Sequence, residues 1–138
     1  MGITFDSNTI KLISMFESIT RARVKDCFDN KGTMVFIVEE GDIGKALGKK
    51  AVNVRKIENM LKKKIRVIEY STDITKFVRN VIMPNKANEI TYEEGIITIT
   101  PTDPQSRGYL IGRAAEILRN NESIVKKYYK DLKEIKVV

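Results

Sequence analysis

The chain is organised around residues 46–61, which have the sequence ALGKKAVNVRKIENML. An apolar pair leads to Gly48, two lysines follow, and apolar residues then recur at helical spacing. This pattern predicts a bare, positively charged turn at the start of a helix. Gly48 has no side chain to hold a polyanion away, a helix start has unpaired N–H groups, and Lys49 and Lys50 add formal charge.

The same plan recurs 64 positions later, where residues 111–119 have the sequence IGRAAEILR. Gly112 then matches Gly48, and Arg119 matches Arg55. A twofold repeat of about 65 to 70 residues with its turns in register indicates two similar structural units.

The order of predicted elements also repeats, as helix, strand, strand, helix, helix, strand in each half. The sequence therefore predicts an α+β protein with two domains, residues 1–71 and 72–138. In the first half we expect a helix capped by Asp6 or Ser7 and ending near Thr20, strands at 24–28, 33–38 and 65–70, a turn at 29–32, and helices at 43–47 and from the glycine turn to about 63. In the second half we expect a helix between the 71–73 cap and Pro84, strands at 89–92, 96–100 and 135–138, a short helix toward Ile111 capped by Thr102 or Asp103, and a longer helix ending near Lys133.

The charge balance favours an acidic partner. The chain has 138 residues, a net charge of +7 and a pI near 9.5, which makes nucleic acid the most plausible partner class. Residues 1–70 contain 14 basic and 9 acidic residues, a net charge of +5. Residues 71–138 contain 11 basic and 9 acidic residues, a net charge of +2.

Residue usage argues against an enzyme. The chain has no histidine, so both the commonest general acid/base and the commonest transition-metal ligand are missing. It also has no carboxylate pair, metal cluster or phosphate-binding loop of the Gly-x-x-x-x-Gly-Lys-Ser/Thr type. We expect no catalytic residue, metal or cofactor.

The sequence also bears on the compartment. The single cysteine, Cys27, lies within a predicted strand, where we expect it to be a small buried hydrophobe, and it can form no disulfide within the chain. No basic segment followed by a long apolar run begins the chain, and no stretch approaches the roughly 18 apolar residues that span a bilayer. We expect a soluble, cytoplasmic monomer that does not contact membranes.

Both glycine turns resemble the nucleic-acid loop of KH domains, which has the pattern Gly-x-x-Gly between two helices. The order of elements is that of the type II KH fold. Two such domains joined by residues 69–73, EYSTD, resemble the short archaeal NusA-like transcription termination/antitermination proteins. The resemblance covers nearly the whole chain and implies two tandem type II KH domains that bind single-stranded RNA to modulate transcription elongation or termination.

The chain departs from the KH pattern at one position in each copy. Ala51 and Ala115 stand where the second glycine of the loop is expected. A methyl group there removes clearance for the RNA backbone, so we expect a weaker grip than a full Gly-x-x-Gly loop gives. Lys49 and Lys50 should make the first turn the stronger of the two.

The resemblance implies that RNA lies along an extended surface of the two domains. Gly48 and Gly112 would permit close approach, helix amides with Lys49, Lys50 and Arg113 would hold phosphates, and Leu47 and Ile111 would face bases. Gly44 either extends this groove with Lys45 or permits tight helix packing, and Arg55 and Arg119 either reach a phosphate or are solvated. The predicted RNA-binding residues are Gly44, Lys45, Leu47, Gly48, Lys49, Lys50, Ala51, Arg55, Ile111, Gly112, Arg113, Ala114, Ala115 and Arg119.

Other functions stay open on the sequence alone. The chain could be an adaptor that binds RNA polymerase or another protein, through acidic residues expected at the hairpin tips, Glu39, Glu40, Glu93 and Glu94. It could also be a KH protein with a role at the ribosome or in RNA processing. The run Lys62 to Lys64 is most simply a solvated helix end whose charge favours the helix dipole.

Overall fold

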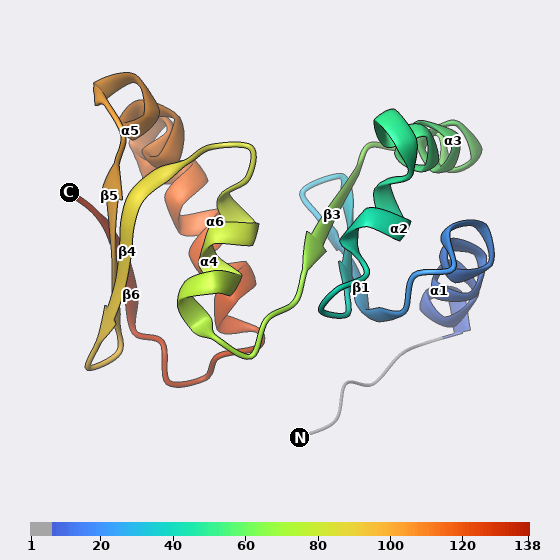
Figure 1. Ribbon diagram of the computed structural model, residues 1–138, viewed down its shortest axis with the longest axis horizontal. Helices are drawn as coiled ribbons and strands as arrows, with labels where there is room; N and C mark the ends of the chain where they lie inside the picture. The colour runs from blue at the N-terminus through green and yellow to red at the C-terminus, as the bar shows by residue number, and fades with distance from the viewer. Residues whose placement is uncertain (1–6) are drawn as a thin grey trace. The chain divides into compact units, whose positions relative to one another are not determined.

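The computed structural model describes residues 7–138. Its contacts divide the chain into two compact units, Met1–Tyr70 and Ser71–Val138, and each is described by itself (Figure 1). The predicted cap Asp6 lies outside the described residues, and Ser7 is the first residue of the first helix. None of the helices formed by residues 7–138 is long and apolar enough to cross a bilayer.

The first unit is a three-stranded sheet with helices packed on it. Its elements are α1 (Ser7–Thr20), β1 (Val24–Asn30), β2 (Thr33–Val38), α2 (Ile43–Leu47), the short 3-10 turn η1 (Lys49–Ala51), α3 (Val52–Leu61) and β3 (Ile65–Glu69). The sheet has the order β1-β2-β3, in which β1 is antiparallel and β3 parallel to the central β2. A parallel partner requires a crossover connection, and α2 with α3 provides it.

The core of this unit lies between the sheet and its helices. Phe16 of α1 stacks on Phe36 of β2 with ring centroids 4.2 Å apart, and both side chains are fully buried. Cys27 belongs to the same cluster and is 5% exposed. This burial confirms the expectation of a small buried hydrophobe. Burial, aided by the nearby charge of Asp26, also raises the pKa of the Cys27 thiol to about 12.

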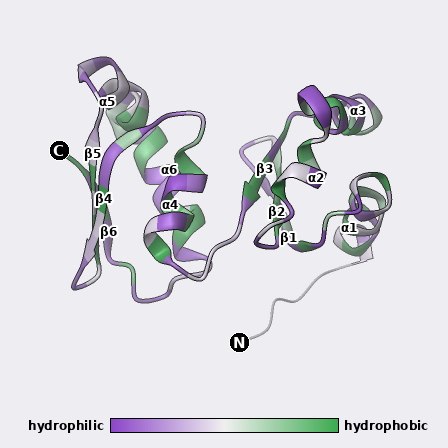
Figure 2. Cartoon of the chain, viewed as in Figure 1, coloured by the Kyte–Doolittle hydropathy of each residue, from purple (hydrophilic) through white to green (hydrophobic). Residues whose placement is uncertain are grey.

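The second unit repeats the plan. Its elements are α4 (Ile74–Ile82), β4 (Ala87–Glu93), β5 (Ile96–Pro101), α5 (Pro104–Ile111), the 3-10 turn η2 (Arg113–Ala115), α6 (Glu116–Lys126) and β6 (Glu134–Val137). The sheet has the order β4-β5-β6, again with one antiparallel and one parallel pair. In Figure 2 the helices of both units carry hydrophobic and hydrophilic residues together, as expected for helices that bury one face.

Aspartates begin two of these helices. The Asp73 side chain accepts a hydrogen bond from the Thr75 amide at 2.9 Å, and the Asp103 side chain accepts one from the Ser106 amide at 2.7 Å. Asp103, and not Thr102, is therefore the cap of α5. Bonds from the Thr75 hydroxyl and amide lower the pKa of Asp73, and bonds from the Ser106 amide and hydroxyl lower that of Asp103.

The predicted end of the longer helix was wrong. The helix α6 stops at Lys126, seven residues before the expected end near Lys133, and the chain continues in turns. Tyr128 and Leu132, which prolonged the helical pattern, lie beyond the helix: the Tyr128 ring packs against Phe77 with centroids 5.6 Å apart, and Leu132 is buried in the turns. Tyr129 also packs against Phe77, with centroids 5.8 Å apart. The Tyr129 hydroxyl also donates to the carbonyl of Ser71.

The first hairpin is tighter than predicted. The strand β1 runs on through Asp29 and Asn30, which pair with Met34 and Thr33, so the turn is only Lys31 and Gly32. Both turn residues have positive φ, 53° and 91°, as a two-residue type I′ turn requires.

Candidate nucleic-acid interface

The two glycine turns have the same backbone conformation. The first turn (residues 48–51) joins α2 to α3, and the second turn (residues 112–115) joins α5 to α6. Gly48 has φ 72° and ψ 176°, and Gly112 has φ 74° and ψ 178°, a region open essentially to glycine alone. Each glycine donates its N–H to a second glycine four residues earlier, Gly44 at 3.0 Å and Gly108 at 2.9 Å. The sequence repeat thus reproduces one turn geometry twice.

The second glycine position of the KH pattern has positive φ in both turns. Ala51 has φ 57° and ψ 32°, and Ala115 has φ 60° and ψ 22°. The residues before them, Lys50 and Ala114, are also left-handed, with φ 54° in each. A left-handed conformation costs a residue with a Cβ roughly 1–2 kcal/mol, which gives a physical reason for a glycine there. Both alanines are strained.

Two side chains stabilise the first turn by hydrogen bonds to its backbone and to the helix before it. The Asn53 amide nitrogen donates to the carbonyl of Lys45 at 3.0 Å, and the Arg55 Nη1 donates to the carbonyl of Lys50 at 2.6 Å. Asn53 also lies against Gly48, because a Cβ at that glycine would be 2.8 Å from its Nδ2. Arg55 therefore holds the shape of the turn, a role that the sequence did not predict.

The second turn has different neighbours at the matching positions. Ile117 replaces Asn53 and covers Gly112, where a Cβ would be 2.6 Å from the Ile117 Cγ1. Arg119 occupies the position that corresponds to Arg55, but it has other partners. Its Nη1 bonds to Glu122 at 2.6 Å, and its Nη2 lies 3.6 Å from Glu134. Arg119 thus points its charge at two carboxylates.

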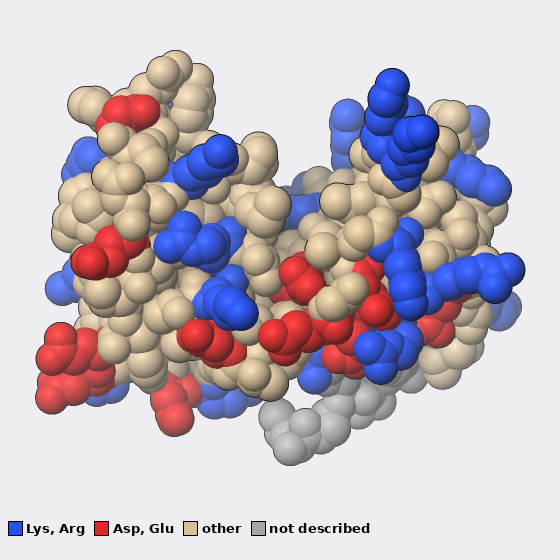
Figure 3. Space-filling view, viewed as in Figure 1, with Lys and Arg blue, Asp and Glu red and all other residues tan. Residues whose placement is uncertain are grey.

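The charge around the two turns differs strongly. Residues 45–56 include five basic residues and no acidic one, whereas residues 109–120 include two basic residues and the acidic Glu116. Lys49 and Lys50 are exposed, and in Figure 3 Lys and Arg gather over the region between α2 and α3. Glu116 is the first residue of α6, where its carboxylate interacts favourably with the helix dipole.

Other predicted site residues lie along the helices that precede the turns. Gly44 is exposed, and a Cβ built on it would meet no atom within 4 Å, which argues against the tight-packing interpretation. Lys45 is exposed one residue later. Leu47 and Ile111 end α2 and α5 and are half-buried. Five further residues lie beside the turns and were not predicted from the sequence, although the 64-residue repeat pairs each with a residue near the other turn: Asn53, Gly108, Tyr109, Glu116 and Ile117.

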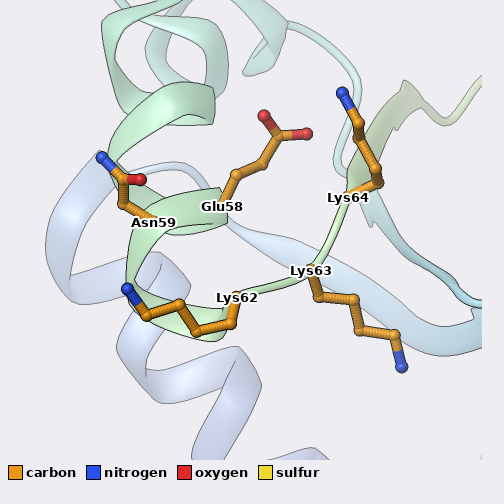
Figure 4. A pocket seen from close by; sticks show the side chains of 5 residues that line it. All are labelled: Glu58, Asn59, Lys62, Lys63 and Lys64. Carbon is orange, nitrogen blue, oxygen red and sulfur yellow. The ribbon is translucent and has the colours of Figure 1, made fainter.

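The lysines after α3 do not converge. They line a shallow hollow of about 310 Å³ together with Glu58 and Asn59. Figure 4 shows the side chains of Lys62, Lys63 and Lys64 pointing in different directions, and Lys63 Nζ pairs with Asp29 at 2.6 Å. The hollow therefore does not surround one anion with three ammonium groups, which favours the solvated helix end.

The acidic residues suggested for an adaptor surface are not all at hairpin tips. Glu39 and Glu40 lie in the connection between β2 and α2, where Glu39 is half-buried and its N–H donates to the carbonyl of Arg23 at 2.9 Å. Glu93 and Glu94 do lie at the tip between β4 and β5, and both are exposed. Among residues 7–138, no group of three or more His, Cys, Asp or Glu is placed to hold a metal ion.

Several curated proteins are similar to this chain over most of its length. The probable transcription termination protein NusA of Methanocaldococcus jannaschii is 31% identical over 99% of this chain and 75% of its own length. Its counterpart of the same name in Methanococcus vannielii is 34% identical over 81% of this chain and 66% of its own length, and that of Halococcus morrhuae is 24% identical over 99% of both.

Comparison of structures supports the fold. The crystal structure of APE1850 superposes with a TM-score of 0.75 at 22% identity, covering 97% of this chain and 100% of the other. No model of a known protein family matches the chain. The match to the Methanocaldococcus jannaschii protein, however, is 31% identical and covers 99% of this chain and 75% of that protein. The chain therefore belongs to the family of archaeal proteins named probable transcription termination protein NusA.

Proposed function

We propose that the chain is an RNA-binding transcription factor of the NusA type, built from two tandem type II KH domains at residues 1–71 and 72–138. The family supports a role in transcription termination. The helix-strand-strand-helix-helix-strand order of each unit, and the glycine turn between two helices, support the KH assignment.

In this proposal the first turn holds phosphates of single-stranded RNA. Gly48 leaves the backbone bare, and Lys49 and Lys50 are exposed beside it. The Val52 amide donates to the Lys49 carbonyl, and Ala51, the cap residue of α3, supplies no side-chain acceptor for the amides that follow. A phosphate oxygen can take that place. These exposed lysines around a glycine turn at the start of a helix are the observation that carries the proposal.

RNA bound at this turn would act on transcription while the transcript leaves the polymerase. The chain contributes affinity for the transcript and no chemical step. RNA polymerase is then the second partner, and the chain acts as a monomer.

Fluorescence anisotropy with a short single-stranded RNA tests the proposal. Binding should weaken as salt rises, because phosphate contacts release counterions. The double variant Lys49→Asp/Lys50→Asp should bind several-fold more weakly than the parent. The matched control is Lys62→Asp/Lys64→Asp, which makes the same change in charge in the same unit at two exposed lysines of the hollow.

The outcomes separate this proposal from its rivals. Equal weakening by both double variants would mean that general charge, and not the first turn, attracts RNA. An adaptor function would be favoured if RNA polymerase were retained in a pull-down after nuclease treatment while the parent failed to bind RNA. Retention of ribosomal particles instead of polymerase would indicate the alternative role at the ribosome.

A further inference from the structure

We propose that the two turns contact RNA by different means, and that the second turn stacks an unpaired base on Tyr109 and Ile117 instead of holding phosphates. This inference rests on the proposed RNA-binding function. It follows from a contrast: the turns share one backbone geometry, yet the side chains around them differ in charge, polarity and exposure.

The second turn is poorly suited to phosphates. Its neighbourhood has two basic residues, and one of them, Arg119, is held by Glu122 and Glu134. Glu116 places a negative charge on the first turn of α6, where a phosphate would otherwise be attracted by the helix amides. Arg113 has Glu116 three residues after it in the sequence, whereas Lys49 and Lys50 have no acidic residue among residues 45–56.

The same neighbourhood presents an aromatic ring. Tyr109 replaces Lys45 at the position three residues before the turn glycine, and its side chain is 55% exposed. Residues three apart on a helix share a face, so Tyr109 and Gly112 lie on one side of α5. The Gln105 Nε2 donates to the Tyr109 hydroxyl at 3.2 Å, which fixes the phenol along the helix while the ring stays exposed.

An aliphatic side chain and bare backbone complete the surface. Ile117 lies directly on Gly112 and is still 44% exposed. Gly108, adjacent to Tyr109, is exposed, and a Cβ there would meet no atom within 4 Å. The turn at Gly112 therefore has an exposed aromatic ring three residues before it and an exposed aliphatic side chain directly on it, and aromatic rings are the groups on which bases stack.

The size of this surface favours a base over a protein. Stable protein interfaces involve about 20 to 30 residues on each side, whereas one aromatic ring and one aliphatic side chain match a single nucleobase. The surface is also continuous with the turn whose counterpart in the first unit is the proposed phosphate site. RNA presents both phosphates and bases. A first turn that binds phosphates and a second turn that stacks a base would therefore contact both kinds of group.

Salt dependence distinguishes the two kinds of contact. We compare the parent, Tyr109→Ala and Lys49→Gln/Lys50→Gln by anisotropy at several salt concentrations, with a single-stranded RNA of about ten nucleotides. Log affinity falls as log salt rises, and in the lysine variant this fall should be less steep by about 0.7 for each phosphate that it can no longer bind. The Tyr109→Ala variant should bind on the order of tenfold more weakly with the slope unchanged.

Two tyrosine controls make the comparison specific. Tyr109→Phe keeps the ring and loses only the bond to Gln105, so it should bind like the parent. Tyr92→Ala removes a 39% exposed tyrosine from β4 of the same unit and should leave binding unchanged. Parental affinity in Tyr109→Ala, or a salt dependence that becomes less steep as in the lysine variant, would overturn the inference.

A second measurement does not depend on losing a side chain. The chain has no tryptophan, so Tyr109→Trp would introduce its only indole. Stacking on a base should quench this fluorescence with the same dissociation constant that anisotropy gives. No quenching, in a variant that still binds RNA, would overturn the inference while the proposed function stands. A parent chain that binds no RNA would overturn both.

Discussion

Ala51 and Ala115 adopt the same left-handed conformation at the last position of their turns, with φ 57° and 60°. Each is followed directly by the first residue of a helix, Val52 or Glu116. The sequence places a methyl group where the backbone favours a glycine, and this strain occurs in both units.

Replacing either alanine by glycine should therefore stabilise the protein. Glycine removes the left-handed strain of the folded protein, but it also gives the unfolded chain more conformational entropy. The net effect should be a free energy of unfolding that is higher by roughly 0.5–1 kcal/mol. Urea denaturation measures this change. Ala46→Gly is the control, since Ala46 lies buried within α2, and the same exchange there should destabilise.

The glycine at the start of each turn should not tolerate a side chain. Gly48→Ala and Gly112→Ala should each cost about 1–3 kcal/mol, because φ near 73° with extended ψ is a strained region for alanine. The added methyl group would also collide with Asn53 or Ile117. Gly44→Ala provides the matched control in the same helix, where open space and helix propensity should leave stability equal or up to about 1 kcal/mol higher. A loss at Gly44 as large as at Gly48 would contradict this explanation.

The helix caps give a prediction about pH. The pKa of Asp73 is lowered in the folded protein, chiefly by its bonds from Thr75, so the unfolded chain binds protons more readily and the ionised cap favours folding at neutral pH. That contribution should begin to disappear as the pH falls through the ordinary aspartate value of 3.8. Asp73→Ala should lower the melting temperature at pH 7, and the difference from the parent should narrow below pH 3.8. A difference that stayed constant from pH 7 to pH 3 would show that ionisation of the cap does not matter.

The buried thiol gives a prediction about reactivity. Raising the Cys27 pKa from 9.0 to about 12 lowers the thiolate fraction on the order of a thousandfold at neutral pH. Iodoacetamide should therefore modify the native protein far more slowly than the chain unfolded in guanidinium, where the same single cysteine is accessible. Similar rates in the two states would mean that β1 opens readily.

The sequence predicted the parts of this structure that depend on local pattern. The positions of Gly48 and Gly112 located both turns, because a glycine that interrupts two apolar helical patterns usually marks a turn between helices. The order of helices and strands also follows from periodicity within each segment. The pattern from Val24 to Val38 predicted a hairpin, although Asp29 and Asn30 were assigned to its turn because such residues are usually found in turns.

The remaining features depend on contacts between segments distant in the sequence. The end of α6 was misplaced because Tyr128 and Leu132 continue a helical spacing, while the ring of Tyr128 packs against Phe77 of α4. Arg119 was expected to match Arg55, but Glu134 of β6 lies close enough to attract it. A single sequence does not reveal which carboxylate a surface arginine will meet.

Amide chemical shifts on titration with RNA test most directly whether the first turn is the RNA site. A short single-stranded RNA is added to the ¹⁵N-labelled protein, and the shifts of all backbone amides are followed. The largest changes should fall on Gly48 to Arg55, with smaller ones around Tyr109 and Gly112. Changes confined to the hollow at Lys62–Lys64 or to the hairpin tip at Glu93 and Glu94, with residues 48–55 unmoved, would contradict the proposed function.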